Sequence, residues 1–70
     1  MTHSTSPQVR MANEIAVHFH HRPAEEAAAA IAAHIRKFWD PRMRADLLAR
    51  AQSEAASLDP LVIAATRHLA

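Results

Sequence analysis

The sequence contains no cysteine, no glycine and no tyrosine, and each absence narrows what the chain can be. Without cysteine there are no disulfides and no thiolate ligands for a metal ion. Without glycine, tight hairpins and left-handed turns lack the residue that they usually require, which argues against an all-β fold. The composition instead favours helices, because alanine, the strongest helix former, is the most frequent residue.

Long apolar runs are also absent. No stretch approaches the ~18–20 consecutive apolar residues that a membrane-spanning helix needs. The opening residues, Met-Thr-His-Ser-Thr-Ser-Pro, are not followed by the apolar segment of a secretory signal. We therefore expect a cytoplasmic protein that makes no contact with a membrane.

What is present is a short, nearly neutral chain of 70 residues with a net charge of +1. A domain of this size buries roughly 60% of its unfolded surface, and its core contributes only ~3–5 kcal/mol of net stability. Because disulfides and thiolate-bound metals are excluded, a partner subunit or self-association is the remaining common source of stability. We expect a single helical domain at 7–70, preceded by a flexible N-terminus at 1–6.

Four prolines divide the chain into helices. Three of them follow a side chain that can cap a helix, and a proline at the next position lacks an amide that would be unsatisfied anyway: Ser6-Pro7, Asp40-Pro41 and Asp59-Pro60. Pro23 has no such cap, but Glu25 and Glu26 follow it, where the helix dipole favours acidic residues. The predicted helices are 7–21, 23–38, 41–56 and 60–69. The fold class is therefore all-α, a small bundle of three main helices plus a short C-terminal helix.

Apolar residues recur at helical spacing within these segments. The expected buried stripe is Met11, Ile15 and Phe19 in the first helix, and Ala27, Ile31, Ile35 and Phe38 in the second. The alanine-rich stretch 27–33 has two interpretations. Alanine has high helix propensity, and its small side chain also lets another helix approach closely.

Six histidines raise the question of a metal site. Glu14, His18 and His21 fall on one face of the first predicted helix, and imidazole plus carboxylate is a set that zinc accepts. No motif of two histidines with a catalytic glutamate accompanies them, and His21 lies at a helix end. We therefore interpret these histidines as packed or solvated side chains and predict no metal site.

The sequence offers no convincing catalytic group. Most hydroxyl side chains lie at helix ends or joins, and Glu25 and Glu26 diverge by about 100° around a helix. Short helices are also poor at enclosing a deep pocket. We predict that the chain has no catalytic residues and is not an enzyme on its own.

Positive charge is concentrated in residues 34–44, His-Ile-Arg-Lys-Phe-Trp-Asp-Pro-Arg-Met-Arg. This segment has four basic side chains against one acidic side chain, and it contains the only tryptophan. Tryptophan and arginine are preferred at the centres of protein interfaces. The segment is therefore a candidate docking surface, and its residues are Arg36, Lys37, Phe38, Trp39, Arg42 and Arg44.

The helix dipole separates these cations into two groups. Arg36 and Lys37 end a helix, where positive charge is favourable, whereas Arg42 and Arg44 begin one, where it is not. Asp40 can neutralise one of the latter two, which leaves the other for an acidic partner. Nucleic-acid binding is an alternative for a helix–turn–helix with these cations, but the chain is barely basic and Asp46 and Glu54 follow on the same helix.

Two stretches resemble a known family. Val-Arg-Met-Ala-Asn-Glu-Ile-Ala at 9–16 and the segment 34–44, with a proline-started acidic and alanine-rich helix between them, closely resemble the delta subunit of bacterial NAD-dependent formate dehydrogenase. The resemblance spans roughly residues 9–52, and Lys-Phe-Trp-Asp-Pro-Arg-Met-Arg is its most specific part. The histidine-rich residues 18–21 are not part of the family pattern.

The resemblance implies a small non-catalytic subunit that supports assembly, stability or cofactor maturation of a multi-subunit enzyme. The alpha subunit of that enzyme carries a molybdenum bis-guanine dinucleotide cofactor and iron–sulfur clusters. Other subunits carry FMN, further clusters and the NAD site. The expected partner is a larger subunit, with alpha as the first candidate, and not nucleic acid. A homodimer of the isolated chain and a transient cofactor-insertion chaperone remain as alternatives.

The resemblance also indicates what the cations bind. Arg36, Arg42 and Arg44 are expected to pair with carboxylates of a larger subunit, or with an anionic cofactor group during its insertion. Trp39 has two interpretations, because a lone tryptophan in a small bundle is commonly packed inside. It is either part of the docking surface or the centre of the core.

Overall fold

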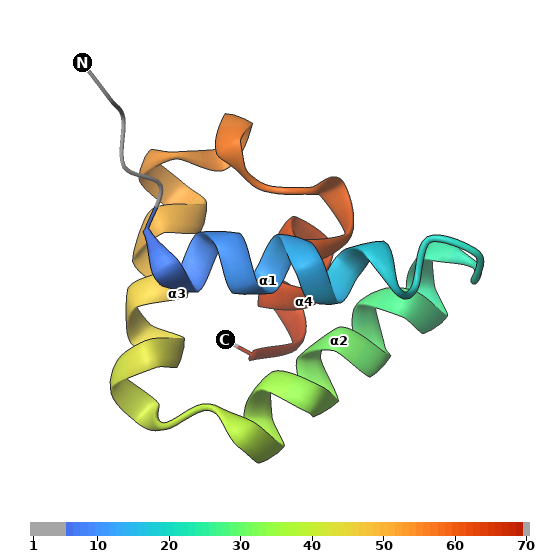
Figure 1. Ribbon diagram of the computed structural model, residues 1–70, viewed down its shortest axis with the longest axis horizontal. Coiled ribbons are helices and arrows are strands. Elements are labelled where there is room, and N and C mark those ends of the chain that lie inside the picture. Colours follow the sequence, from blue (N-terminus) through green and yellow to red (C-terminus); the bar gives the residue numbers. More distant parts are fainter. Residues whose placement is uncertain (1–5, 70) are drawn as a thin grey trace.

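Helices account for nearly all of the structure, a computed structural model that describes residues 6–69 (Figure 1). The elements in chain order are α1 (Pro7–Val17), α2 (Ala24–Phe38), α3 (Pro41–Ser53), the short 3-10 helix η1 (Ala55–Ser57) and α4 (Pro60–Leu69). Residues 6–69 contain no strand. The predicted all-α bundle is confirmed. The predicted flexible N-terminus, 1–6, lies outside the described residues except for Ser6.

Three helices begin as the prolines predicted. The Ser6 hydroxyl accepts the amide of Gln8 at 3.2 Å, and Asp40 accepts that of Met43 at 2.8 Å. Asp59 accepts the amide of Leu61, also at 2.8 Å. α2 begins after Pro23 without a side-chain cap, and Glu25 and Glu26 lie in its first turn.

Two predicted helix ends are wrong. The first helix ends at Val17 instead of 21, and the third ends at Ser53 instead of 56. Residues 18–22 form tight turns, and the His20 imidazole lies 2.7 Å from the carboxylate of Asp59 at the start of α4. This contact joins the turn after α1 to the start of α4. After α3, η1 redirects the chain so that Leu58 reaches the core, where it is 6% exposed.

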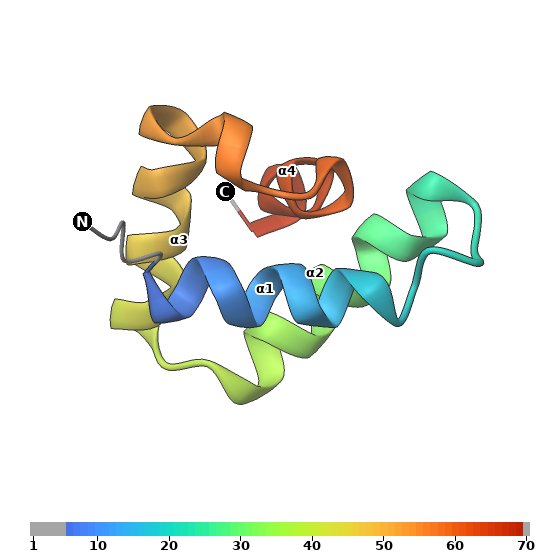
Figure 2. The same ribbon diagram turned by 45° about the horizontal axis from the view of Figure 1, so that its top comes forward.

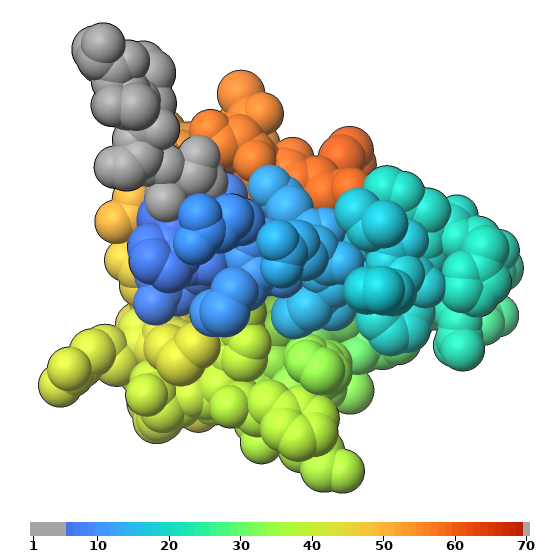
Figure 3. All heavy atoms as spheres, in the orientation of Figure 1, coloured from blue at the N-terminus to red at the C-terminus, as the bar shows by residue number. Residues whose placement is uncertain are grey.

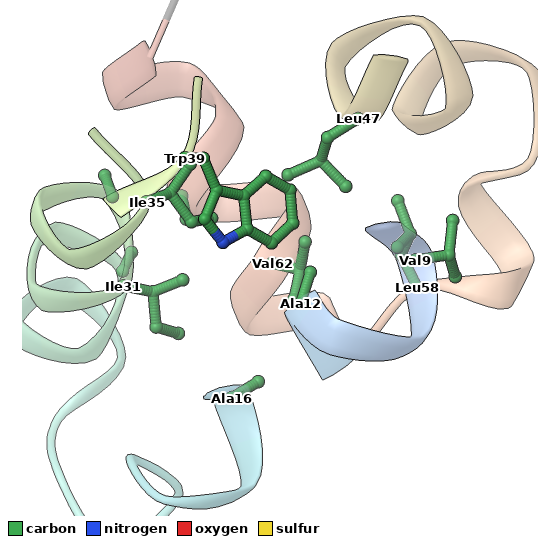
Figure 4. Packing of buried hydrophobic residues seen from close by; sticks show 12 residues of the cluster. Val9, Ala12, Ala16, Ile31, Ile35, Trp39, Leu47, Leu58 and Val62 are labelled. Atoms are coloured by element: carbon green, nitrogen blue, oxygen red, sulfur yellow. The ribbon is translucent and has the colours of Figure 1, made fainter. Parts of the chain in front are cut away.

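The core lies where all four helices meet. Its largest fully buried side chains are Val9, Ile31, Ile35, Leu47 and Val62. Figure 4 shows them around the indole of Trp39. The expected stripe of the first helix is displaced, because Val9, Ala12 and Ala16 are buried whereas Met11, Ile15 and Phe19 pack around the edge.

The closest pairing in the bundle is between α2 and α4. Figure 2 shows α4 nearly end-on, between α3 and the beginning of α2. Ala28, Ala32 and Ala65 are buried, whereas Ala29 and Ala33 are exposed. Both interpretations of the alanine-rich stretch therefore apply. The buried alanines allow α4 to approach, and the exposed ones add only helix propensity.

Asn13 connects α1 to the segment before α4. Its amide nitrogen donates to the Ser57 carbonyl at 3.0 Å, and its amide oxygen accepts the Asp59 amide at 2.8 Å. These residues are more than 40 positions apart in the sequence, so one side chain closes a long loop.

Replacing Asn13 by alanine is expected to remove both hydrogen bonds and to lower the free energy of unfolding by about 1–3 kcal/mol. Urea denaturation followed by far-UV circular dichroism measures the change. Gln52→Ala is the control, because Gln52 is an exposed amide on α3 and its loss is expected to change stability by less than about 0.5 kcal/mol. Equal midpoints for the two variants would contradict the bridging role of Asn13.

None of the described helices combines the length and the apolar character that crossing a membrane requires.

Candidate docking surfaces

The predicted docking segment forms the corner between α2 and α3. The structure divides its six residues into three groups by what each side chain contacts. Two of the six, Arg36 and Trp39, contact other helices of the bundle. Lys37 and Phe38 are exposed at the end of α2, and Arg42 and Arg44 lie in the first turn of α3.

Trp39 belongs to the core. It is 7% exposed and is part of the same cluster as Ile35, Leu47 and Val62 (Figure 4). Its backbone is extended (φ −96°, ψ 142°), and its amide still donates to Ile35 at the end of α2. The helix thus ends one residue earlier, and the extended backbone directs the indole inward. Of the two interpretations of Trp39, the structure supports the core.

Phe38, which the spacing placed in the core, is instead 65% exposed. The His34 ring packs against its ring with centroids 4.8 Å apart, and the Lys37 ammonium lies 5.6 Å from its centroid. The latter distance is within the range of a cation–π interaction. An exposed aromatic ring with an adjacent cation is the kind of surface that protein interfaces favour.

The Arg36 guanidinium donates to the backbone carbonyl of His68 at 2.6 Å. His68 lies in the last turn of α4, whose final carbonyls lack partners within the helix. Its imidazole also lies 3.2 Å from the Glu25 carboxylate on α2. Arg36 therefore fastens α4 to α2, which is a structural role that the charge pattern did not indicate.

Arg42 and Arg44 have no carboxylate partner within residues 6–69. Asp40, the expected counter-charge, uses one oxygen to cap α3 and forms no ion pair with either arginine in this part of the chain. Arg50 differs, because Asp46 and Glu54 lie 3.0 and 2.9 Å from it. The hydrogen bond that Arg50 donates to Asp46 raises the pKa of Arg50, and the two carboxylates satisfy this cation within the chain. We call Lys37, Phe38, Arg42 and Arg44 the corner surface.

A second surface feature was missed by the sequence reasoning. An open groove of ≈ 380 Å³ separates α1 from the second half of α2, and it is lined by Met11, Glu14, Ile15, His18, His34 and Trp39. Figure 3 shows this side of the molecule, where α1, in blue to cyan, borders the yellow-green residues around the α2–α3 corner. We call it the α1–α2 groove. Four of the lining residues recur at the spacing of one helical face, so the sequence could have indicated them: Met11, Glu14, Ile15 and His18. The other two, His34 and Trp39, come from α2 and its end, and only the tertiary structure brings them to the groove.

The face predicted for Glu14, His18 and His21 does not form. α1 ends at Val17, so His21 lies in the following turn. The neighbouring His20 contacts Asp59 at the start of α4. Among the described residues, no group of three or more histidine, aspartate or glutamate side chains is arranged to hold a metal ion.

The chain is a small all-α bundle with a basic, aromatic corner and an open groove. The two features that distinguish it, the basic corner and the groove, lie on its surface. The family model of the NADH-dependent formate dehydrogenase delta subunit, FdsD, matches residues 8–66, and the chain belongs to this family. The resemblance inferred from 9–52 is thereby confirmed and extended at both ends. No curated protein and no solved structure matches the chain.

Proposed function

We propose that this chain is a non-catalytic accessory subunit of a formate dehydrogenase. We propose further that it binds a larger subunit through the corner surface, and that this subunit is alpha. The observation that carries the proposal is the pair Arg42 and Arg44, which lie at the positive end of α3 without a carboxylate partner in the described chain. Carboxylates of a partner would stabilise both cations. The proposed role is to support assembly and stability of the enzyme.

The hydroxyl contacts support a non-catalytic role. Ser6 donates to Gln8 and Asp46, Ser53 to the Ala49 carbonyl and Thr66 to the Ile63 carbonyl. Ser53 and Thr66 donate only to backbone carbonyls, and the Asp46 carboxylate near Ser6 is already paired with Arg50, so none of the three hydroxyls contacts a histidine or an unpaired carboxylate that could activate it as a nucleophile. Because the sequence has no cysteine, iron–sulfur clusters have no thiolate ligands here. We propose that the molybdenum bis-guanine dinucleotide cofactor, the clusters, FMN and the NAD site belong to the larger subunits.

Reversing both charges, Arg42→Glu with Arg44→Glu, is expected to lower recovery of the chain with the larger subunits by about tenfold or more, since attraction becomes repulsion. Co-purification on a tagged alpha subunit measures the loss. The matched control is Arg10→Glu with Arg67→Glu, because both residues are exposed cations on other helices. If the two double variants are recovered equally and both are folded, the corner surface is not the docking site.

The same two arginines also suit the phosphates of the molybdenum cofactor, which favours a maturation role as a second candidate. A chaperone that inserts the cofactor would leave once the enzyme is mature, whereas a structural subunit would stay. Quantifying all subunits in purified active enzyme separates these roles. A stoichiometric amount of this chain supports the structural subunit, and its absence supports the transient chaperone.

A further inference from the structure

The α1–α2 groove is a surface of mixed chemistry that the corner surface does not include. Met11 and Ile15 are half-buried, and Trp39 lines the groove from the end of α2. Its polar groups are the carboxylate of Glu14 and the imidazoles of His18 and His34. The groove thus combines an apolar floor with one formal negative charge.

Glu14 is exposed and forms no ion pair with any cation of residues 6–69. Four of the six other acidic side chains do have such contacts: Asp46 and Glu54 with Arg50, Asp59 with His20, and Glu25 with His68. An unpaired carboxylate beside an apolar floor is complementary to a ligand that presents an apolar group next to a cation.

The size of the groove favours a macromolecular ligand. Its volume of ≈ 380 Å³ is near the lower end of the range for small-molecule sites, about 300–1,000 Å³. Such sites enclose most of their ligand, whereas this groove is open to solvent. An open groove of this volume suits a side chain projecting from a larger partner.

We propose that the α1–α2 groove binds a segment of a larger formate dehydrogenase subunit in which an apolar side chain is flanked by an arginine or lysine. The apolar side chain packs on Met11, Ile15 and Trp39, and the cation pairs with Glu14. This inference rests on the proposed function, and it adds a contact of opposite sign to the basic corner. Both surfaces include residues at the end of α2, and two contacts of opposite sign would together fix the orientation of the bound chain.

The test is a charge reversal at Glu14. The full-length chain is titrated by calorimetry into the remaining subunits of the enzyme, prepared without it. Glu14→Arg is expected to weaken binding by about tenfold or more, because two cations then face each other. Glu26→Arg is the matched control, since Glu26 is an exposed acid at the opposite end of α2, and its affinity is expected to stay within about twofold. Circular dichroism shows that each variant is folded.

A photo-crosslinking residue in place of His18, which is exposed at the groove, then identifies the occupant. A crosslink to a larger subunit, beside an apolar residue and an arginine or lysine, supports the proposal. A crosslink to a second copy of this chain overturns it in favour of a homodimer. Wild-type affinity of the Glu14→Arg variant also overturns the groove proposal. In that case, loss of binding by the Arg42→Glu, Arg44→Glu double variant would still support the proposed function. If the wild-type chain does not bind the remaining subunits, the proposed function fails and the groove proposal fails with it.

Discussion

Replacing Trp39 by alanine is expected to lower the free energy of unfolding by about 3–5 kcal/mol, the usual cost of truncating a buried aromatic side chain. A domain of this size has a net stability of only ~3–5 kcal/mol, so the variant is expected to be largely unfolded. The effect is expected to be large because the indole is 7% exposed and belongs to the core cluster that all four helices form. Far-UV circular dichroism during urea titration measures the effect without relying on the lost fluorophore.

Phe38→Ala is the matched control, because Phe38 is the next residue and also aromatic but is 65% exposed. Its truncation is expected to change stability by less than about 0.5 kcal/mol. Similar losses for the two variants, or a larger loss at Phe38, would mean that the indole is not the centre of the core.

The second large effect is expected at Ala28. Its side chain is 0% exposed on the helix that packs closest to α4. Leucine at this position adds three carbon atoms to a filled space, and overpacking of this kind costs about 1–3 kcal/mol. Thermal or urea denaturation of Ala28→Leu measures the loss.

Ala29→Leu provides the comparison for Ala28. Ala29 is the adjacent residue in the same alanine run but is exposed, so leucine there is expected to change stability by less than about 0.5 kcal/mol. If both leucine variants are as stable as the wild type, the alanines serve helix propensity alone, and close approach of α4 does not require them.

Helix beginnings could be predicted from the sequence because they are local. A capping side chain followed by proline fixes the start of α1, α3 and α4 within a few residues of chain. Helix ends were less predictable. α1 ends at Val17, and the turn that follows makes a contact between His20 and Asp59, which are far apart in the sequence. No local pattern contains that contact.

The positions of Phe38 and Trp39 also depend on where a helix ends. The spacing placed Phe38 in the core, but Trp39 is the buried residue. Helical spacing from Ile31 and Ile35 leads to Phe38, but the helix ends there and the next residue has an extended backbone. The change in backbone conformation places Trp39 in the core and Phe38 outside. A periodic pattern describes the interior of a helix and not the residue after it.

The candidate sites were predictable to different degrees. The basic segment 34–44 is contiguous, so its charge was visible in the sequence. The sequence did not show which of these cations lack a partner. That depends on the fold, because Arg36 reaches α4 and Asp40 caps α3. The α1–α2 groove depends on the relative placement of two helices, which only the three-dimensional structure specifies.

The position of Trp39 has a further consequence for optical spectroscopy. With one tryptophan and no tyrosine in the sequence, a single indole dominates the near-ultraviolet absorption and the intrinsic fluorescence. That indole is packed in the core and also lines the α1–α2 groove. Its emission maximum is therefore an internal reporter of unfolding, and a quencher attached to a peptide segment would reveal whether that segment enters the groove.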